Sequence, residues 1–271
     1  MDRYVVIGNP IAHSRSPEIH AAFARQTGEA LAYDRLLVAP GDFPRAIAAF
    51  FSGGGCGANV TLPFKLEAYA YAHRLTARAR AAGSVNTLKR LDDGAILGDN
   101  TDGAGLVRDL TFNLGWSVAG KRVLLIGAGG AARGVVGPLL AEQPSELMVV
   151  NRTVARAEAL VESFRDAGVI RAAGLDLAGD APYDLVINAT SAGTRGEGVV
   201  MPPGATSRQT CAYDMAYGAG ARPFIERARA AGAQATADGL GMLVEQAAES
   251  FLLWRGLRPE TAPVIAMLRG A

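Results

Sequence analysis

The chain has 271 residues, of which 49% are hydrophobic, 20% are charged and 7% are aromatic, and its formal net charge is +1. This length is enough for one large or two ordinary domains, and the composition is typical of a compact α/β protein rather than a disordered or fibrous one. Charges of both signs are mixed without the basic stripe of a nucleic-acid binder, and no apolar run reaches the roughly 20 residues of a membrane span.

The two cysteines, Cys56 and Cys211, lie far apart in the sequence and form no CxxC pair. We interpret them as reduced thiols of a cytoplasmic protein. The first residues, "MDRYVVIGNP", begin directly with a strand pattern and lack the basic flank and apolar stretch of a signal peptide. We therefore expect no nucleic-acid or membrane partner. Separately, we expect the protein to be a monomer or homodimer that binds a small-molecule substrate.

Strand and helix patterns alternate along the first part of the chain. This alternation predicts βαβ units on a mainly parallel sheet. Residues 85–100 differ, because two short extended runs flank Asp92-Asp93-Gly94 and indicate a hairpin. The predicted strands cover residues 4–8, 33–38 and 57–61, and the predicted helices cover residues 16–28, 40–51 and 63–75.

A second series of strands begins at residue 121, after a predicted connecting helix at 102–115. We predict two α/β domains. Two C-terminal helices are expected to return to the first domain and close it. The first domain comprises residues 1–102 plus 238–271, and residues 103–237 form a Rossmann-type domain. The first predicted strand of the second series opens the segment 121–140, "KRVLLIGAGGAARGVVGPLL". The later strands cover 146–152, 183–190 and 210–217, the helix between them covers 154–164, and the closing helices cover 238–256 and 258–270.

The segment "VLLIGAGGAA" is a strand followed by a glycine-rich loop and the start of a helix. Gly127 permits a tight turn, Gly129 lets the backbone approach a pyrophosphate, and Ala132 allows close packing of the helix on the strand. The free N–H groups of the helix N-terminus favour phosphate. This context predicts a dinucleotide site rather than a glycine-rich loop without a ligand.

The residues after the next strand discriminate between the two nicotinamide dinucleotides. An NAD enzyme usually has a carboxylate there to accept from the ribose hydroxyl. Here the strand ends in Asn151-Arg152-Thr153, and Arg156 follows one helical turn later. Two guanidinium groups and a hydroxyl suit a 2′-phosphate, so we predict NADP. The alternative is a solvated helix start, which fits Arg156 better than Arg152.

A nicotinamide enzyme that interconverts a ketone and an alcohol needs a group that moves the hydroxyl proton. No tyrosine has a lysine four residues later, which argues against the Tyr-x-x-x-Lys route. Zinc and His–Asp routes are disfavoured because His13, His20 and His73 are scattered and the cysteines are remote. We predict no metal site, and a lysine remains the candidate.

Of the three lysines, only Lys65 lies at a strand-to-helix junction, where parallel sheets bind ligands. We place Pro63 at the first helical position and Lys65 in the first turn, although the helix dipole disfavours a cation there. An exposed lysine at the helix start is the alternative. The expected carboxylate partner is Asp102, whose alternative role is a helix N-cap, and Asp99 competes for either role.

Neutral polar side chains suited to a hydroxyl-rich substrate also lie at strand ends. Ser14 and Ser16 follow the first strand, and Ser16 also reads as an N-cap before Pro17. In the long C-terminal helix we expect the core stripe to be Leu240, Leu243, Val244, Ala247, Phe251 and Trp254. The other polar candidates are Asn59, Thr61, Asn86 and Gln246, the last of which can equally be a solvated glutamine.

Taken in order, these motifs resemble the shikimate dehydrogenase family over essentially the whole chain. "NVTLPFK" and "GDNTDGAG" are highly specific, whereas the glycine loop alone is not. One departure is the stretch 76–86, which is richer in arginine than is usual for the family. The other matching segments are "GNPIAHSRSPEIH", "AGSVNTL", "GAGGAAR", "NRT", "NATSAG", "YDMAY" and "DGLGMLVEQAAESF".

The resemblance implies a substrate-binding N-terminal domain, an NADP domain, and reversible reduction of 3-dehydroshikimate to shikimate on the chorismate pathway to aromatic amino acids. It implies that Lys65 and Asp102 form the catalytic pair and also contact substrate. The implied further substrate contacts are Ser14, Ser16, Thr61, Asn86, Tyr217 and Gln246. The implied NADP contacts are Gly127, Ala128, Gly129, Gly130, Ala131, Asn151, Arg152, Thr153 and Arg156, with Thr190, Met215 and Gly239 towards the nicotinamide.

Two other hypotheses are compatible with the sequence. A quinate/shikimate dehydrogenase that uses NAD or both cofactors is disfavoured by Asn151-Arg152-Thr153. A non-catalytic dinucleotide sensor would keep the glycine loop but would not need both Lys65 and Asp102.

Overall fold

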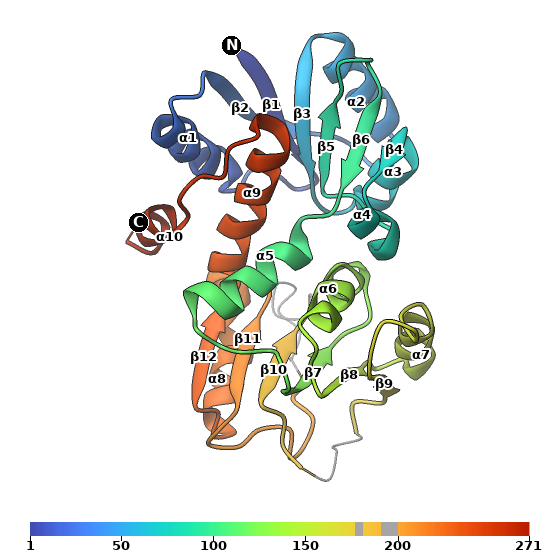
Figure 1. The fold of residues 1–271 in the computed structure, drawn as a ribbon, viewed down its shortest axis with the longest axis vertical. Coiled ribbons are helices and arrows are strands. Elements are labelled where there is room, and N and C mark those ends of the chain that lie inside the picture. Colours follow the sequence, from blue (N-terminus) through green and yellow to red (C-terminus); the bar gives the residue numbers. More distant parts are fainter. Residues whose placement is uncertain (177–180, 191–199, 271) are drawn as a thin grey trace. The chain divides into compact units, whose positions relative to one another are not determined.

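The computed structural model describes residues 1–176, 181–190 and 200–270 of the chain. Its contacts divide the chain into two compact units, Met1–Gly105 with Val244–Ala271, and Leu106–Leu243. Each unit contains a six-stranded sheet with helices (Figure 1). The chain passes between the units within helices α5 (Asp102–Arg108) and α9 (Leu240–Arg255). The predicted α/β class is confirmed.

The sheet of the first unit has the strand order β2-β1-β3-β5-β6-β4. β1 pairs in parallel with β2 and β3, whereas β5 is antiparallel to β3 and β6, which confirms the predicted hairpin. The strands are β1 (Asp2–Gly8), β2 (Leu31–Leu37), β3 (Gly55–Val60), β4 (Arg74–Leu75), β5 (Thr87–Arg90) and β6 (Ile96–Asp99), and the helices are α1 (Ser16–Thr27), α2 (Phe43–Ser52), α3 (Lys65–Tyr71), α4 (Ala77–Ala82) and α10 (Ala262–Arg269).

The prediction of a helix over 63–75 is wrong at both ends. α3 begins at Lys65 with Phe64 as its N-cap, and Pro63 lies outside the helix in a cis peptide bond with Leu62. At the other end, Arg74 and Leu75 pair in parallel with β6 as strand β4. Lys65 is therefore the first helical residue, and Pro63 belongs to the loop that leads to it.

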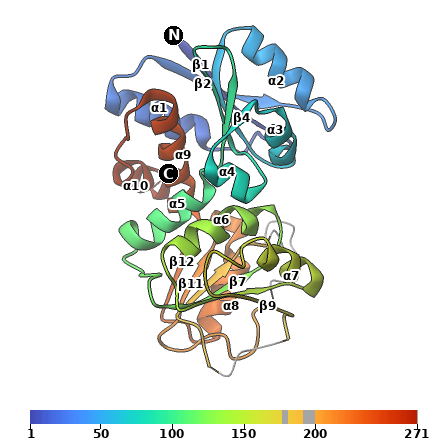
Figure 2. The same cartoon turned by 45° about the vertical axis from the view of Figure 1, so that its right-hand side comes forward.

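The sheet of the second unit has the order β12-β11-β10-β7-β8-β9, and every pair of neighbours is parallel. This is the doubly wound order of dinucleotide-binding folds, with its switch point between β7 and β10. Figure 2 shows α6 and α7 beside this sheet. The elements are β7 (Arg122–Ile126), α6 (Gly130–Ala141), β8 (Glu146–Val150), α7 (Val154–Glu162), β9 (Ile170–Ala173), β10 (Leu185–Asn188), β11 (Cys211–Asp214), α8 (Arg222–Ala230) and β12 (Ala235–Asp238).

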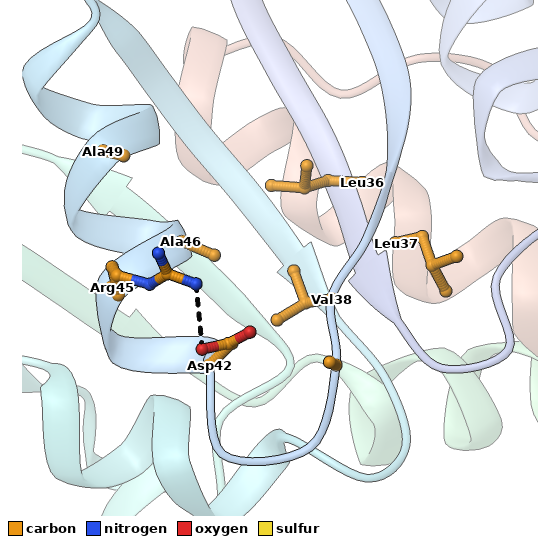
Figure 3. Close-up of a pocket in the computed structure, with 8 residues that line it drawn as sticks. Leu36, Leu37, Val38, Asp42, Arg45, Ala46 and Ala49 are labelled. Atoms are coloured by element: carbon orange, nitrogen blue, oxygen red, sulfur yellow. Dashed lines mark hydrogen bonds and ion pairs between the residues drawn. The ribbon is translucent and has the colours of Figure 1, made fainter.

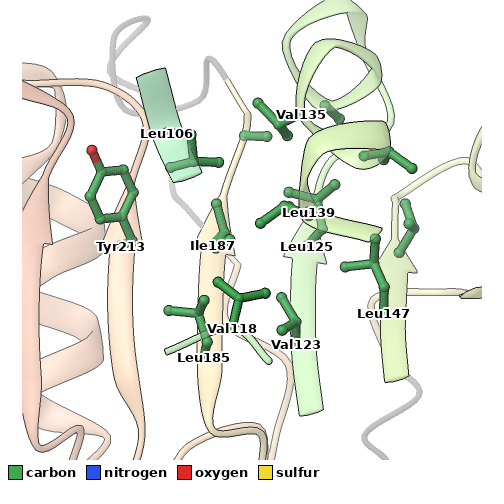
Figure 4. Close-up of a cluster of buried hydrophobic side chains, with 14 of the residues drawn as sticks. Leu106, Val118, Val123, Leu125, Val135, Leu139, Leu147, Leu185, Ile187 and Tyr213 are labelled. Carbon is green, nitrogen blue, oxygen red and sulfur yellow. The ribbon is translucent and has the colours of Figure 1, made fainter. Parts of the chain in front are cut away.

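A large apolar cluster packs on one face of the second sheet (Figure 4). Leu125 of β7, Ile187 of β10 and Val135 of α6 are completely buried in it. These strands carry apolar residues on both faces because helices cover a parallel sheet on both sides. Every described helix is too short or too polar to cross a bilayer.

Helix α9 buries most of the predicted stripe, with Val244, Ala247 and Phe251 completely buried. Leu243 is only partly buried, contrary to expectation, whereas Met242 is buried in the core of the second unit. The helix starts in one unit and continues in the other, so the face that it buries changes along its length. A single helical stripe cannot describe two different environments.

The predicted connecting helix changes geometry half-way. α5 is followed directly by one π-helical turn at Asp109–Asn113. Asp109 is buried there, and its Oδ2 accepts a hydrogen bond of 2.6 Å from the Tyr213 hydroxyl. A Cβ on Gly241 of α9 would lie 1.9 Å from Asp109 Oδ1, so only glycine fits at position 241.

Candidate active site

Lys65 and Asp102 form an ion pair in the first unit, with 2.5 Å between Nζ and Oδ2. Lys65 is the first residue of α3 and Asp102 is the first residue of α5, so each follows directly on the loop after a strand. The side chains retain 23% and 13% of their exposure, which leaves both accessible to a small molecule. The carboxylate offsets the unfavourable position of the lysine at a helix N-terminus.

Asn86 orients the carboxylate of this pair. Its Nδ2 donates to Asp102 Oδ1 at 2.8 Å and lies 3.4 Å from Gln246 Oε1. Its Oδ1 accepts from the backbone N–H of Thr101 at 2.9 Å. Because Asn86 is buried and hydrogen-bonded through both ends of its amide, it holds Asp102 in one orientation relative to Lys65.

A layer of buried polar side chains lies behind Asn86. Thr87 Oγ1 donates to Asn86 Oδ1 at 2.9 Å and accepts from Asn59 Nδ2 at 3.1 Å. Asn59 also donates to Ser250 of α9 at 2.9 Å and accepts from the Tyr33 hydroxyl at 2.7 Å. This layer supports the candidate site with groups from β2, β3, β5 and α9.

Ser14 and Ser16 form a local pair in which Ser14 Oγ donates to Ser16 Oγ at 3.2 Å. Ser16 is the first residue of α1 and makes no capping hydrogen bond, so the N-cap alternative is wrong. Thr61 follows β3, and its Cγ2 would lie 2.6 Å from a Cβ on Gly8. Ser14 closes a turn in the loop after β1, in which its N–H donates to the Ile11 carbonyl at 3.0 Å.

Asp99 belongs to a separate ionic network and does not compete for Lys65. Arg78 donates to both oxygens of Asp99 at 2.7 and 2.6 Å and also to Glu249 at 3.0 Å. Burial raises the pKa of Asp99, but the hydrogen bonds and charge of Arg78 outweigh this effect and lower it below its usual value. The arginine-rich departure at 76–86 thus places Arg78 in an ion pair that ties α4 to β6 and α9.

The glycine loop of the second unit leads from β7 into α6. Gly127 has φ +111°, which requires glycine, and its N–H donates to the Val150 carbonyl at 2.7 Å. A Cβ on Gly129 or Gly130 would meet no atom within 4 Å, so the backbone is open to a ligand there. Ala132 is completely buried against the sheet. These features fit a pyrophosphate at the start of α6.

The loop after β8 presents the residues predicted to discriminate the dinucleotide. Asn151 Nδ2 donates to the Thr153 carbonyl at 2.9 Å and shapes the turn into α7. Arg152 and Arg156 are both exposed, and neither is paired with a carboxylate elsewhere in the described chain. Two such guanidinium groups at this strand end fit a 2′-phosphate.

Thr190, Met215 and Gly239 follow the carboxyl ends of the neighbouring strands β10, β11 and β12. Met215 N–H donates to the Asn188 carbonyl at 3.0 Å, and a Cβ on Gly239 would lie 2.3 Å from the Met215 carbonyl oxygen. Tyr217 is half-buried in the same unit, just before a short 3-10 helix. Of the predicted "NATSAG" segment, residues 191–193 lie outside the described residues.

Three family models match the chain. They are the shikimate dehydrogenase substrate binding domain at residues 6–88, shikimate / quinate 5-dehydrogenase at 110–196, and the shikimate 5'-dehydrogenase C-terminal domain at 239–269. Together they cover most of the chain in the order expected for one protein. The chain belongs to the shikimate dehydrogenase family.

Individual proteins are similar to this chain over almost its whole length. The shikimate dehydrogenase (NADP(+)) of Alkalilimnicola ehrlichii is 57% identical over 268 residues, which cover 99% of this chain and 98% of the relative. An Ael1 enzyme from Pseudomonas putida has a TM-score of 0.93 at 44% identity, covering 99% and 98%. Shikimate 5-dehydrogenase from Thermus thermophilus, solved with NADP(H) and shikimate, has a TM-score of 0.86 at 30% identity, covering 99% of each chain.

A groove of about 280 Å³ beside α2 contains none of the residues predicted for a shikimate dehydrogenase (Figure 3). Its walls are mostly aliphatic residues from the end of β2 and one face of α2, with the Asp42–Arg45 ion pair of 3.0 Å at its rim. In the described segments, no three His, Cys, Asp or Glu side chains form a group that could hold a metal ion.

The structure brings Lys65, Asp102, Asn86 and Gln246 of this shikimate dehydrogenase family member together in the first unit. In the second unit Gly127 and Thr190 lie side by side, since a Cβ on Gly127 would be 3.0 Å from Thr190 Cγ2. Sequence reasoning did not single out the supporting residues, which are Thr87, Thr101, Asn188, Asp214 and Ser250. Their only signal was the presence of small polar residues or a carboxylate at buried strand ends and within an apolar helix.

Proposed function

We propose that this chain is an NADP-dependent shikimate dehydrogenase that reversibly reduces 3-dehydroshikimate to shikimate on the chorismate pathway to aromatic amino acids. The observation that carries the proposal is the Lys65–Asp102 pair of 2.5 Å, which is partly exposed and held by Asn86. The full-length similarity to NADP(+)-named relatives supports the cofactor and the substrate.

Lys65 is proposed as the acid–base group of the reaction. Reduction of the ketone adds a hydride to carbon and a proton to oxygen, and NADPH supplies the hydride when bound. The Lys65 ammonium has three N–H donors, one of which is used by Asp102, so others are available for the C3 oxygen. In the forward direction Lys65 donates its proton to that oxygen, and in the reverse direction its amine takes the proton back.

Asp102 and its neighbours hold the substrate and the lysine. Asp102 is the second proposed catalytic residue, because its carboxylate orients Lys65 and can accept from a substrate hydroxyl. We keep Ser14, Ser16, Thr61, Asn86, Tyr217 and Gln246 as proposed substrate contacts. Serine, threonine, tyrosine and amide side chains both donate and accept, which suits a ligand that carries several hydroxyls.

The second unit is proposed to hold NADP. The open backbone at Gly129 and Gly130 suits the pyrophosphate, and exposed Arg152 and Arg156 suit the 2′-phosphate. We keep Gly127, Ala128, Ala131, Asn151 and Thr153 in the same role, with Thr190, Met215 and Gly239 towards the nicotinamide.

The functional boundaries, residues 1–102 plus 238–271 and residues 103–237, remain our proposal for the substrate-binding and NADP domains. We also propose a cytoplasmic location, where NADPH-dependent biosynthesis takes place, and a monomer or homodimer without nucleic-acid or membrane partners. Light scattering on the purified protein measures the oligomeric state, and a larger assembly would contradict this part of the proposal.

The proposal is tested by the NADP-dependent absorbance change with shikimate and, separately, with quinate. We expect turnover with shikimate and NADP. Lys65→Ala should lower kcat by a factor of about 10²–10⁴, because general acid–base catalysis contributes that much, while the Kd for NADPH stays nearly unchanged. Lys121→Ala is the matched control, since Lys121 is a half-buried lysine of the second unit whose ammonium has only a 3.6 Å contact with Asp184.

The outcomes separate the competing functions. Turnover that favours quinate or NAD would identify a quinate/shikimate dehydrogenase, an activity that one of the matching family models also names. NADPH binding without turnover on either substrate would identify a dinucleotide sensor. Retained turnover in Lys65→Ala would refute the role assigned to Lys65.

A further inference from the structure

Asp214 is a buried carboxylate at the carboxyl end of β11, and none of the roles proposed above uses it. It is completely buried and makes no ion pair with any described lysine, arginine or histidine. Its Oδ2 accepts from Asn188 Nδ2 at 2.9 Å and its Oδ1 accepts from Ala216 N–H at 2.8 Å. A buried charge with only neutral partners is costly, so the presence of a carboxylate at this position requires an explanation.

The neighbouring strand explains what the carboxylate does. Asn188 is the last residue of β10 and lies directly opposite Asp214 in the parallel register. A carboxylate can only accept hydrogen bonds, so Asn188 must turn its NH₂ group towards Asp214. Asn188 Oδ1 then faces the other way and accepts from Thr190 N–H at 3.1 Å and from Thr190 Oγ1 at 2.8 Å.

Thr190 is thereby held in one orientation. Its hydroxyl proton is committed to Asn188, and its methyl group points at the glycine loop, where a Cβ on Gly127 would lie 3.0 Å from Cγ2. Asn188 also pairs with Ile126, the residue before Gly127. The contacts Asp214–Asn188–Thr190–Gly127 therefore run across the switch point of the sheet, from β11 to β7.

The environment of Asp214 is unfavourable for its charge. Burial raises the pKa of Asp214 to about 6, the hydrogen bonds from Asn188 and Ala216 lower it in part, and the charge of Asp238 on β12 raises it further. An asparagine at this position would avoid the cost of burying a charge. It would, however, offer one acceptor oxygen to two donors, Asn188 Nδ2 and Ala216 N–H, so its NH₂ group would face one of them.

We propose that Asp214 is a positioning residue of the NADP site, which acts through Asn188 to hold Thr190 against Gly127. The inference rests on the proposed function, because it assumes that NADP binds at the glycine loop. Asp214 itself touches no ligand in this scheme. Its carboxylate selects one of the two amide orientations of Asn188, and that orientation decides which way Thr190 faces.

An exchange of the two side chains tests this directly. In Asp214→Asn the introduced NH₂ group faces either the NH₂ group of Asn188 or the N–H of Ala216, and in Asn188→Asp two carboxylates face each other. In the double variant every hydrogen bond is restored. The introduced asparagine would donate to the introduced aspartate and accept from Ala216 N–H, while that aspartate would also accept from both Thr190 donors. Asp184→Asn is the matched control, because Asp184 lies just before β10, at the opposite end of the strand that carries Asn188.

The Kd for NADPH is measured by fluorescence titration, together with kcat, both KM values and Tm. We expect each single variant to raise the Kd and the KM for NADPH about tenfold, which is the effect of one mismatched hydrogen bond, with the KM for shikimate unchanged. The double variant should recover to about twofold of the wild type, and the control should bind normally. A purely structural defect would lower the active fraction and Tm without changing the KM for NADPH.

Normal NADPH binding in Asp214→Asn would overturn the inference while leaving the proposed function intact. So would a double variant that is as weak as the two single variants combined, because the coupling is then absent. If a single variant fails to fold, the double variant decides alone, since its binding either recovers or does not. Absence of NADPH binding in the wild type would refute the proposed function and this inference with it.

Discussion

His20 lies on α1 within the aromatic core of the first unit. It is completely buried and stacks on Tyr33 with ring centroids 4.2 Å apart, and its ring also packs near Phe251 and Trp254. Neither ring nitrogen has a hydrogen-bond partner in the described parts of the chain. Burial lowers the pKa of His20 to about 3, and the Asn59 side chain opposes this shift only in part. The histidine is therefore neutral and acts as an aromatic core residue.

The pKa of His20 predicts a pH dependence of stability. Between about pH 3 and 6.5 the unfolded chain binds a proton at His20 that the folded chain does not, so acidification in this window favours unfolding. At pH 5 the loss is roughly 2 kcal/mol. Urea unfolding of the wild type and of His20→Phe at pH 7 and pH 5 measures this loss of unfolding free energy, which should be smaller in His20→Phe. Equal losses of stability in both proteins would contradict the prediction.

Arg152 carries a second prediction at the scale of single residues. Its exposed guanidinium lies next to the turn that Asn151 closes, where the 2′-phosphate of NADP is proposed to bind. Arg152→Gln should lower kcat/KM for NADP by a factor of about 10–100, as expected for a lost charge-assisted hydrogen bond, and should leave kcat/KM for NAD unchanged. Arg165→Gln, beyond the far end of α7, is the control. An equal loss with both cofactors would exclude 2′-phosphate recognition by Arg152.

At the scale of elements, the junction between α9 and the π-helical turn depends on Gly241. A Cβ there would lie 1.9 Å from Asp109 Oδ1, whose carboxylate also accepts from Tyr213. Burial raises the pKa of the Tyr213 hydroxyl, and the negative charge of Asp109 raises it further, so Tyr213 remains a donor to that carboxylate. A methyl group at position 241 would therefore overlap a carboxylate that is itself buried and hydrogen-bonded.

Gly241→Ala should therefore destabilise the protein by about 2 kcal/mol or more, because overpacking outweighs the gain of about 1 kcal/mol in helix propensity. Gly137→Ala in α6 is the matched control, since its Cβ would meet only Phe164 Cε1 at 3.4 Å. That variant should be neutral or slightly more stable. Denaturant unfolding compares the two, and a Gly241→Ala protein as stable as the control would show that Asp109 can move away at little cost.

At the scale of the whole molecule, the two units differ in how continuous they are. The buried clusters of the second unit contain only residues between 106 and 243. The first unit needs the C-terminal segment, because Trp254 Nε1 donates to the Leu88 carbonyl at 2.9 Å and Ser250 accepts from Asn59. Arg255 adds ion pairs with Asp2 and Glu29.

A fragment of residues 106–243 should consequently fold alone and bind NADPH with a Kd within about tenfold of the intact protein. A fragment of residues 1–105 should remain unfolded until residues 244–271 are supplied, for example by fusion through a flexible linker. Circular dichroism and NADPH titration measure both. An unfolded 106–243 fragment would show that the second unit depends on the first for its stability.

Part of the candidate site was predictable from the sequence, because some positions combine a residue type with a local pattern. The glycine loop, the Asn151-Arg152-Thr153 turn and the hairpin around Gly94 each follow from conformations or charges that are encoded within a few residues. Short elements such as β4, β9 and β12 were not predicted, since two to four residues carry too little periodicity. Pro63 was misplaced because proline suits both a helix start and the loop before it.

The choice between Asp99 and Asp102 shows the limit of sequence reasoning. Asp99 is the last residue of the hairpin and Asp102 follows it three residues later, so no local pattern distinguishes the two carboxylates. The tertiary structure decided which carboxylate pairs with Lys65, because it brings Arg78 to Asp99 and Lys65 to Asp102. The sequence by itself determined the α/β class, the glycine loop and the position of Lys65 at a strand-to-helix junction. These features depend on residues that are neighbours in the chain. Only the fold decided which charges meet, because an ion pair depends on distance in space between residues that are remote in the chain.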